Sequence, residues 1–183
     1  MRIIAGDNKG CQLFAPTWKG LRPTSDRLRE TLFNVLRNKV VGARFLDGYA
    51  GTGAIGLEAM SRGASSVMFV ECDQRAVALI EKNVQRCGRE TGATILCGDL
   101  QDSLARSVEG PCFDLCVLDP PYEFDAATIS AILTAAQAYL ERDGLIVLER
   151  ARRAAPVAVS GLVSRRCVTS GDSALYFYGY EKS

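Results

Sequence analysis

The sequence contains no histidine among its 183 residues. Histidine is the usual general acid or base near neutral pH and a frequent zinc ligand. Any chemistry must therefore proceed without an imidazole.

The seven cysteines form no Cys-x-x-Cys pair and lie mostly in apolar stretches, at positions 11, 72, 87, 97, 112, 116 and 167. We therefore expect reduced thiols in a cytoplasmic protein, and no metal site.

Long hydrophobic runs are also missing. No stretch approaches the ~20 apolar residues that a membrane-spanning helix needs, and the apolar part of the N-terminus is too short for a secretory signal. Hydrophobic residues make up 48% and charged residues 23% of the chain, which is typical of globular proteins. The length predicts one domain with a small appendage. We expect a monomer without a membrane partner.

The net charge of +1 hides an uneven distribution. Residues 1–44 carry nine Lys and Arg against three Asp and Glu, residues 45–149 carry seven against sixteen, and residues 150–183 carry six against two. Basic ends around an acidic middle favour contact between the ends and a polyanion. Chance segregation of surface charge is the alternative.

Residues 1–22 predict a β-hairpin followed by a loop. Two short apolar runs flank the turn sequence DNKG at residues 7–10, as in a hairpin. We treat this segment as an extension of a domain that occupies residues 23–183. Apolar residues at helical spacing then predict a helix that begins after Thr24 or Ser25.

From residue 44 onward, short apolar strands alternate with helices. The predicted strands are RFLD, SVMFVE, ATILCGD, FDLCVLD and GLIVLE. Such a pattern is typical of a parallel sheet covered on both faces. The last two runs, SRRCVTS and SALYFYGYE, alternate around Gly171-Asp172 and predict an antiparallel pair. The predicted fold is α/β and doubly wound, with a mostly parallel sheet and an antiparallel C-terminal hairpin.

The stretch LDGYAGTGAIG, residues 46–56, leads from the first strand into a helix. It contains G-x-G-x-x-G in the strand–helix context that a nucleotide loop requires. Gly51 and Gly53 would let the backbone turn tightly and approach a ligand. Glu71 ends the second strand and suits a ribose diol, and Asp99 ends the third and could accept from an adenine amino group.

NAD and S-adenosyl-L-methionine both fit this loop, and Asp47 distinguishes between them. A pyrophosphate beside its carboxylate would cost about 1–4 kcal/mol at a separation of ~4 Å. S-adenosylmethionine instead carries an ammonium and a sulfonium, which an acidic mouth attracts. An NAD(P)-binding oxidoreductase remains the alternative from another class, although it would need a substrate domain.

The stretch LDPPYEF, residues 118–124, follows the fourth strand and contains the tetrad DPPY. Pro120 and Pro121 stiffen the backbone, so the Asp119 carboxylate and the Pro120 carbonyl form a fixed pair of acceptors. They suit an exocyclic amine, and the Tyr122 ring could stack on a flipped base, worth ~1–3 kcal/mol. Methyl transfer to such an amine depends on alignment and needs no strong base. An oxidoreductase would leave this tetrad unexplained.

Together these stretches resemble the RsmD family of 16S rRNA guanine-N2 methyltransferases along almost the whole chain. The matching stretches are MRIIAG, KG, LRPTSDRLRETLFNVL, AGTGAIGLEAMSRGA, FVE and DPPY. The tetrad alone also marks adenine-N6 methyltransferases, whereas the block RPTSDRLRETLFN is far more specific. The resemblance implies a class I S-adenosylmethionine-dependent methyltransferase with a Rossmann-like fold. Gly48 departs from the family pattern, in which a bulky apolar residue is more usual.

The resemblance also assigns cofactor contacts by motif position. From the methionine part of the cofactor to its adenine, those contacts are Asp47, Gly51, Gly53, Glu71 and Asp99. Thr24 would close over the cofactor, and the residues from Asp119 to Tyr122 would bind the target guanine.

The substrate that the resemblance implies is 16S rRNA in the small ribosomal subunit or its assembly intermediate. The basic ends agree with it, because Lys and Arg neutralise phosphates without reading sequence. The candidate RNA-contacting residues are Arg2, Lys9, Lys19, Arg22 and Arg27. Adenine-N6 methylation of RNA or DNA and a non-catalytic RNA-binding module are the remaining alternatives.

Overall fold

The computed structural model describes residues 1–18, 20–21, 24–110 and 112–181. The strands are β1 (Arg44–Gly48), β2 (Ser66–Glu71), β3 (Ala93–Cys97), β4 (Phe113–Leu118), β5 (Leu140–Ala151), β6 (Leu162–Ser170) and β7 (Ser173–Tyr180). The helices are α1 (Asp26–Leu36), α2 (Ala54–Ser61), α3 (Gln74–Arg86), α4 (Leu100–Ser107) and α5 (Ala126–Gln137), with a short 3-10 helix, η1 (Arg37–Val40), after α1.

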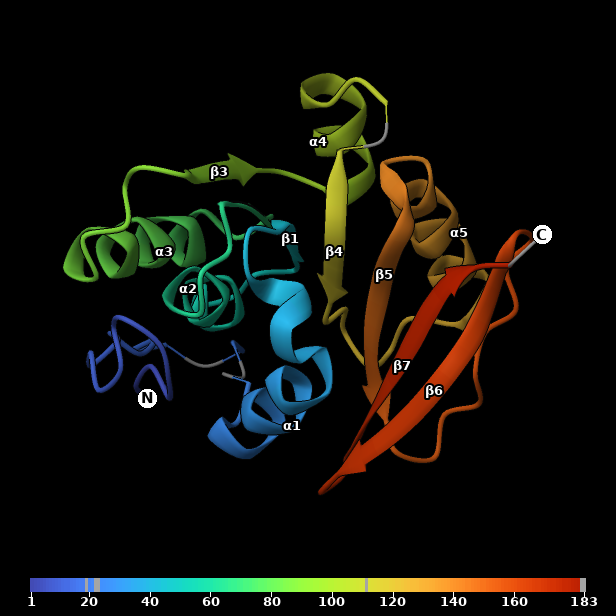
Figure 1. Cartoon of the computed structure of the whole chain (residues 1–183), viewed down its shortest axis with the longest axis horizontal. Coiled ribbons are helices and arrows are strands. Elements are labelled where there is room, and N and C mark those ends of the chain that lie inside the picture. Colours follow the sequence, from blue (N-terminus) through green and yellow to red (C-terminus); the bar gives the residue numbers. More distant parts are fainter. Residues whose placement is uncertain (19, 22–23, 111, 182–183) are drawn as a thin grey trace.

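The described strands form one seven-stranded sheet in the order β3-β2-β1-β4-β5-β7-β6 (Figure 1). Strands β1 to β5 are parallel, and β7 runs antiparallel to both β5 and β6. The predicted doubly wound sheet with an antiparallel C-terminal hairpin is therefore confirmed. The chain moves outward from β1 to β3 and then returns to β4 on the other side of β1. Ligands bind at such a switch point, beyond the carboxyl ends of the strands.

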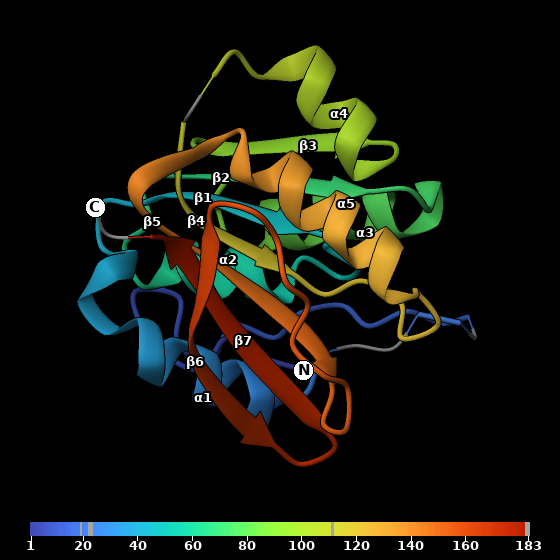
Figure 2. The same ribbon diagram turned by 90° about the vertical axis from the view of Figure 1, so that its right-hand side faces the viewer.

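Successive residues of the central strands pack on opposite faces of the sheet. Phe45 contributes to the core beneath α1, α2 and α3, whereas Leu46 contributes to the core beneath α4 and α5. In β4, Val117 likewise belongs to the first of these cores and Leu118 to the second. Figure 2 turns the α5 side of the sheet toward the viewer, so that α5 crosses in front of the strands. Burial on both faces is the physical reason why these strands read as continuous apolar runs.

The N-terminal segment forms a short antiparallel pairing with one bridge, between Arg2 and Gln12. The Ile3 amide donates to the Cys11 carbonyl at 3.0 Å, and the Gly10 amide donates to the Ile3 carbonyl at 2.9 Å. The predicted turn is present, but the flanking residues do not extend into regular strands. The predicted boundary between residues 1–22 and 23–183 stays a prediction.

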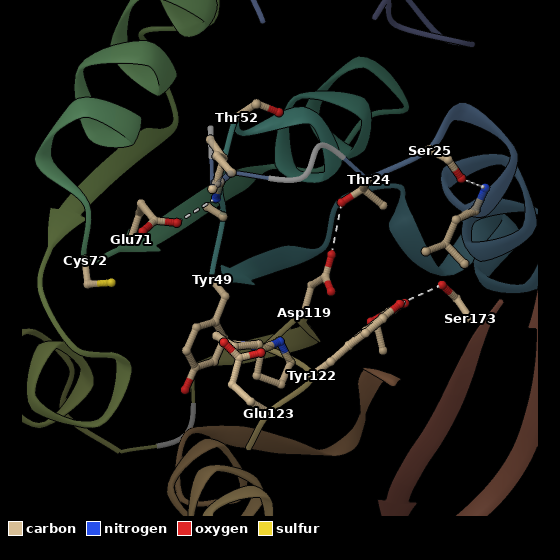
Figure 3. Close-up of a pocket in the computed structure, with 18 residues that line it drawn as sticks. Thr24, Ser25, Tyr49, Thr52, Glu71, Cys72, Asp119, Tyr122, Glu123 and Ser173 are labelled. Carbon is tan, nitrogen blue, oxygen red and sulfur yellow. Dashed lines mark hydrogen bonds between the residues drawn. The ribbon is translucent and has the colours of Figure 1, made fainter. Parts of the chain in front are cut away.

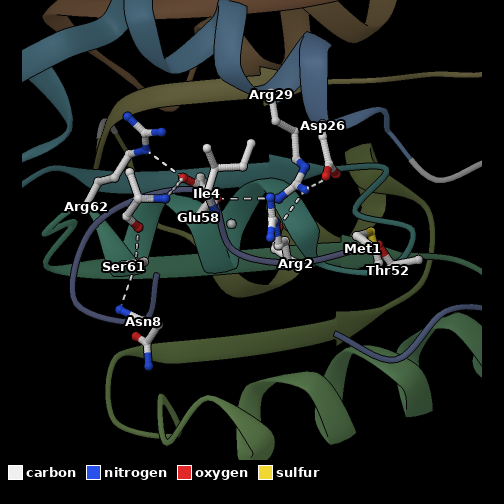
Figure 4. A network of polar contacts seen from close by, with 12 residues as sticks. Met1, Arg2, Ile4, Asn8, Asp26, Arg29, Thr52, Glu58, Ser61 and Arg62 are labelled. Atoms are coloured by element: carbon white, nitrogen blue, oxygen red, sulfur yellow. Dashed lines mark hydrogen bonds and ion pairs between the residues drawn. The ribbon is translucent and has the colours of Figure 1, made fainter. Parts of the chain in front are cut away.

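A buried carboxylate anchors this segment to α2 (Figure 4). Glu58 is fully buried, and its oxygens accept from the amides of Ile4 at 2.7 Å and Ala5 at 3.0 Å. Arg29, also fully buried, and Arg62 pair with the same carboxylate at 3.4 Å and 2.8 Å. These partners offset the cost of burying the charge.

Packing around the end of β1 explains why glycine stands at position 48, which the sequence did not reveal. A Cβ atom at this position would lie 2.6 Å from Leu118 Cδ2 and 3.3 Å from Leu100 Cδ1. The two leucines therefore occupy the space that a bulky residue at the end of β1 would fill.

Among the helices that the structure describes, none is both long and apolar enough to cross a lipid bilayer.

Candidate active site

A cavity of about 410 Å³ lies beyond the carboxyl ends of β1, β2, β4 and β5 (Figure 3). Its described walls are residues between Gly20 and Leu28, the loop after β1, the end of β2, the tetrad after β4, the end of β5 and the start of β7. Its volume is in the range of small-molecule sites. The glycine loop and the tetrad, far apart in the sequence, thus meet in one cavity, as the sequence predicts.

The charged side chains in the described lining of this cavity are all acidic. Four carboxylates contribute to its lining, from Glu71, Asp119, Glu123 and Glu149, and the described lining includes no Lys or Arg. Such a wall attracts a cationic ligand and repels a pyrophosphate. The lining therefore fits the ammonium and sulfonium of S-adenosylmethionine and does not fit NAD.

Glu71 holds the glycine loop in place. Its Oε2 accepts from the Gly51 amide at 2.8 Å, and its Oε1 accepts from the Asp73 amide at 2.9 Å. Gly51 has φ of +57°, a conformation that favours glycine. Each carboxylate oxygen has a second lone pair, so Glu71 can also accept from a ligand in the cavity that it lines.

Asp47 lies behind the loop and is not part of the described lining. It is 1% exposed, and its Oδ2 accepts from the Gly56 amide of α2 at 2.8 Å. Burial raises the pKa of Asp47 well above its usual value; the Gly56 amide opposes this rise, and the charges of Asp119 and Glu71 add to it. The acidic character of the cavity therefore comes from the lining carboxylates more than from Asp47, whose assigned contact with the cofactor stays a prediction.

Gly53 and Asp99 also have local structural roles and are not in the described lining. Gly53 precedes α2 with φ of +74°, and a Cβ there would lie 3.2 Å from Ile80 Cγ2. Asp99 is exposed and caps α4, where its Oδ1 accepts from the Gln101 amide at 2.8 Å. Contact between Asp99 and an adenine stays a prediction.

The tetrad carboxylate has a partner from the segment before α1. The Thr24 hydroxyl donates to Asp119 Oδ2 at 3.0 Å, and Figure 3 shows the two side chains pointing toward each other. The Asp119 amide donates to the Gly48 carbonyl at 3.3 Å, which ties the tetrad to the end of β1. Pro120 is buried and Pro121 is exposed. Thr24 lines the cavity and through this hydrogen bond also orients Asp119, whereas its closure over the cofactor stays a prediction.

The ring of Tyr122 forms part of the cavity wall and is held at its hydroxyl end. The hydroxyl donates to Glu149 Oε1 at 2.7 Å and lies 3.0 Å from Ser173 Oγ. Burial raises the pKa of Tyr122, and the charges of Glu149 and Asp119 raise it further. The side chain is therefore neutral near neutral pH. With 40% of its surface exposed, Tyr122 offers a fixed aromatic surface on which a base can stack.

The lining residues that the sequence analysis missed include Tyr49, Glu149 and Ser173. Tyr49, in the glycine loop, has φ of +63° and makes an edge-on contact with Phe124 at 6.2 Å between ring centroids. Glu149 lies two residues before the end of β5, and it ends the predicted strand GLIVLE as Glu71 ends SVMFVE, so the same strand-end pattern could have indicated it. Ser173 joins the cavity because β7 lies beside β5, which no sequence motif indicated.

The basic candidates divide into two groups. Arg2, Lys9 and Arg27 are exposed, as RNA contact requires. Lys19 and Arg22 lie outside the described residues.

Comparison with known proteins gives concordant matches. The family model described as "Conserved hypothetical protein 95" matches residues 1–179. Ribosomal RNA small subunit methyltransferase D of Haemophilus influenzae is 39% identical over 151 residues, which cover 81% of this chain and 78% of that protein. The protein of the same name from Escherichia coli strain K12 is 35% identical over 149 residues, covering 81% and 74%. A solved structure described as "Putative methyltransferase yhhF from Escherichia coli" superposes with a TM-score of 0.82 at 32% identity, covering 99% of this chain and 98% of that one.

Proposed function

The chain belongs to the RsmD family of ribosomal RNA methyltransferases, and we propose that it transfers a methyl group from S-adenosylmethionine to the exocyclic N2 amine of a guanine in 16S rRNA. The observation that carries this proposal is the meeting of two features in one cavity. An acidic wall beside the glycine loop suits a cationic methyl donor, and the acceptors of the tetrad lie at the next strand end.

The residues of the cavity fit S-adenosylmethionine. When bound, this cofactor supplies an electrophilic methyl group on a sulfonium. Glu71 would accept from the ribose hydroxyls while it holds the Gly51 amide. Gly51 would allow the close approach of the backbone. We also propose the cofactor contacts that the family resemblance assigns to Asp47, Gly53 and Asp99. Asp47 and Gly53 would act through the shape of the glycine loop, and Asp99 would accept from the adenine.

The residues of the tetrad would align the reacting nitrogen. The Asp119 carboxylate and the Pro120 carbonyl would accept the two N–H bonds of the amine, and Tyr122 would stack against the base. Fixing the nitrogen in this way lowers the entropic cost of reaction. As the nitrogen becomes cationic, the Asp119 carboxylate lies ready to accept its proton, so no histidine is needed.

Exposed basic residues near the N-terminus would contact RNA phosphates. These are Arg2, Lys9 and Arg27 in the described chain, together with Lys19 and Arg22 by sequence. We further propose that the substrate is the small ribosomal subunit or its assembly intermediate, that the protein acts as a monomer, and that it acts in the cytoplasm, where such subunits form.

The experiment that tests the proposal uses RNA from cells that lack this protein. Purified protein and S-adenosylmethionine are incubated with naked 16S rRNA and, separately, with small subunits from those cells, and the digested nucleosides are analysed by mass spectrometry. N2-methylguanosine is the expected product. Finding N6-methyladenosine alone would replace the guanine assignment with the adenine one, and finding no methylated nucleoside in either substrate would favour a non-catalytic RNA-binding module.

A further inference from the structure

Only one of the two oxygens of the Glu149 carboxylate has a hydrogen-bond partner among the described residues. Its Oε1 accepts from the Tyr122 hydroxyl at 2.7 Å. Its Oε2 is shielded from water and has no hydrogen-bond partner among the described residues. Glu149 is 3% exposed as a whole, yet it contributes to the wall of the cavity that contains the tetrad.

A buried carboxylate oxygen without a donor is unfavourable, and native structures contain few of them. No donor among the described residues reaches Oε2, and the Tyr122 proton is already used on Oε1. The oxygen is therefore available to accept from a donor that arrives with a ligand. The last torsion of a glutamate side chain is soft, so a small rotation can turn Oε2 toward the cavity while Oε1 keeps the Tyr122 hydroxyl.

We propose that Glu149 selects guanine by accepting a hydrogen bond from its N1–H through Oε2. This inference rests on the proposed function, in which the base stacks on Tyr122 and presents its N2 amine to the tetrad. On the Watson–Crick edge of guanine, N1–H is adjacent to the N2 amine. One side chain, Tyr122, connects the two recognition sites, because it belongs to the tetrad and its hydroxyl donates to Glu149.

The same carboxylate rejects adenine. The N1 atom of adenine carries a lone pair, so it would face the Oε2 lone pairs in a dry site and leave the carboxylate without a donor. Sites built to bind an N–H reject analogues that lack it far more strongly than apolar pockets reject a change of size. The tetrad alone accepts any exocyclic amine, and Glu149 supplies the discrimination that the tetrad lacks.

Ser173 supports this arrangement as a positioning residue. Its hydroxyl lies 3.0 Å from that of Tyr122, and because the Tyr122 proton points to Glu149, Ser173 donates to the Tyr122 oxygen. Ser173, the first residue of β7, thus holds the Tyr122 hydroxyl, which in turn orients the Glu149 carboxylate.

The test uses RNA oligonucleotides that span the methylated nucleotide and carry either guanine or 2-aminopurine at that position. Both bases have an amine on carbon 2, but 2-aminopurine has a lone pair at N1 where guanine has N1–H. Dissociation constants are measured by fluorescence anisotropy in the presence of S-adenosylhomocysteine, so the readout does not depend on turnover. The variants are Glu149→Gln, which places an amide donor at the position of Oε2, and Glu90→Gln, an exposed control in the loop between α3 and β3.

We expect the wild-type protein and Glu90→Gln to bind the guanine oligonucleotide about 10- to 100-fold more tightly than the 2-aminopurine one. Glu149→Gln should lose or reverse this preference, and a melting curve checks that it folds. An undiminished guanine preference in folded Glu149→Gln would overturn the inference. So would a wild-type protein that binds both oligonucleotides equally. If Glu149→Gln does not fold, the wild-type comparison alone decides.

Failure of the proposed function would look different. In that case the wild-type protein yields no N2-methylguanosine in the nucleoside analysis, and no guanine position is available for the oligonucleotides. Failure of the present inference leaves guanine methylation intact and shows only in the comparison of the two bases.

Discussion

The hydroxyl of Thr24 donates a 3.0 Å hydrogen bond to the carboxylate of Asp119, across a sequence separation of 95 residues. The bond joins the segment that leads into α1 to the tetrad that follows β4. The direction in which Asp119 presents its lone pairs therefore depends on the segment before α1 as well as on the stiff proline backbone.

Replacing Thr24 by valine should lower turnover more than cofactor affinity. Valine keeps the β-branched shape but removes the donor to Asp119, and loss of a hydrogen bond to a charged group costs about 10- to 100-fold. We expect turnover to fall by that factor while the dissociation constant of S-adenosylhomocysteine changes by less than about threefold. The matched control Thr24→Ser keeps the hydroxyl and should retain most of the turnover. A Thr24→Val variant with weak cofactor binding and normal turnover at saturating cofactor would assign Thr24 to the cofactor instead.

Glu71→Ala should mainly weaken cofactor binding. The substitution removes the proposed ribose acceptor and also releases the Gly51 and Asp73 amides, so the loop loses its anchor. We expect the dissociation constant of S-adenosylhomocysteine, measured by calorimetry, to rise by about 10- to 100-fold. Glu81→Ala, an exposed change on α3, serves as the control. Equal affinities of Glu71→Ala and wild type would remove Glu71 from the site, and heat of binding from NAD would favour an oxidoreductase.

The stability of the Asp47→Asn variant relative to wild type should increase as pH rises. Burial raises the pKa of Asp47 above its ordinary 3.8, so above that pH the folded protein binds this proton more tightly than the unfolded chain does. The contribution of Asp47 to stability therefore falls as pH rises from about 3.8 toward the folded-state pKa. Asparagine keeps an acceptor for the Gly56 amide and carries no charge.

Melting temperatures of wild type and Asp47→Asn, measured from about pH 4 to about pH 8, check this prediction. The advantage of the variant should be small at the acidic end and grow with pH. An advantage that stays constant or shrinks would mean that the folded protein does not raise the pKa of Asp47.

Much of the fold and half of the site follow from local patterns in the sequence. The apolar strands predict a parallel sheet because both faces of each strand are covered, and the carboxyl ends of such strands share one edge. That rule brings Glu71 and Asp119 to one cavity. Applied to GLIVLE, it would also have indicated Glu149. For Asp99, the sequence analysis assigned only a contact with adenine, and the capping of α4 was found in the structure.

The rest depends on contacts between distant segments. Ser173 reaches the cavity because β7 inserts between β5 and β6, which places it opposite Ala151. A hairpin pattern alone does not say which of its two strands joins the sheet. Likewise, the bond from Thr24 to Asp119 depends on where the segment before α1 lies, and a capping pattern at Ser25 fixes only the start of the helix.

Removing basic charge at Lys9 and Arg22 together should weaken RNA binding and its dependence on salt. Each phosphate contact contributes about 0.7 to 0.9 to the slope of log affinity against log salt concentration. The double variant Lys9→Ala with Arg22→Ala should therefore reduce that slope by about 1.4 to 1.8, measured with 16S rRNA between low and moderate salt. An unchanged slope would mean that the basic N-terminal region does not contact the RNA backbone.

The most direct measurement compares turnover and cofactor affinity in Asp119→Ala, with the exposed change Glu90→Ala as control. If Asp119 holds the reacting amine, turnover on 16S rRNA should fall by about 100-fold or more, while the calorimetric affinity for S-adenosylhomocysteine stays within about threefold of wild type. Wild-type turnover by Asp119→Ala would contradict the account.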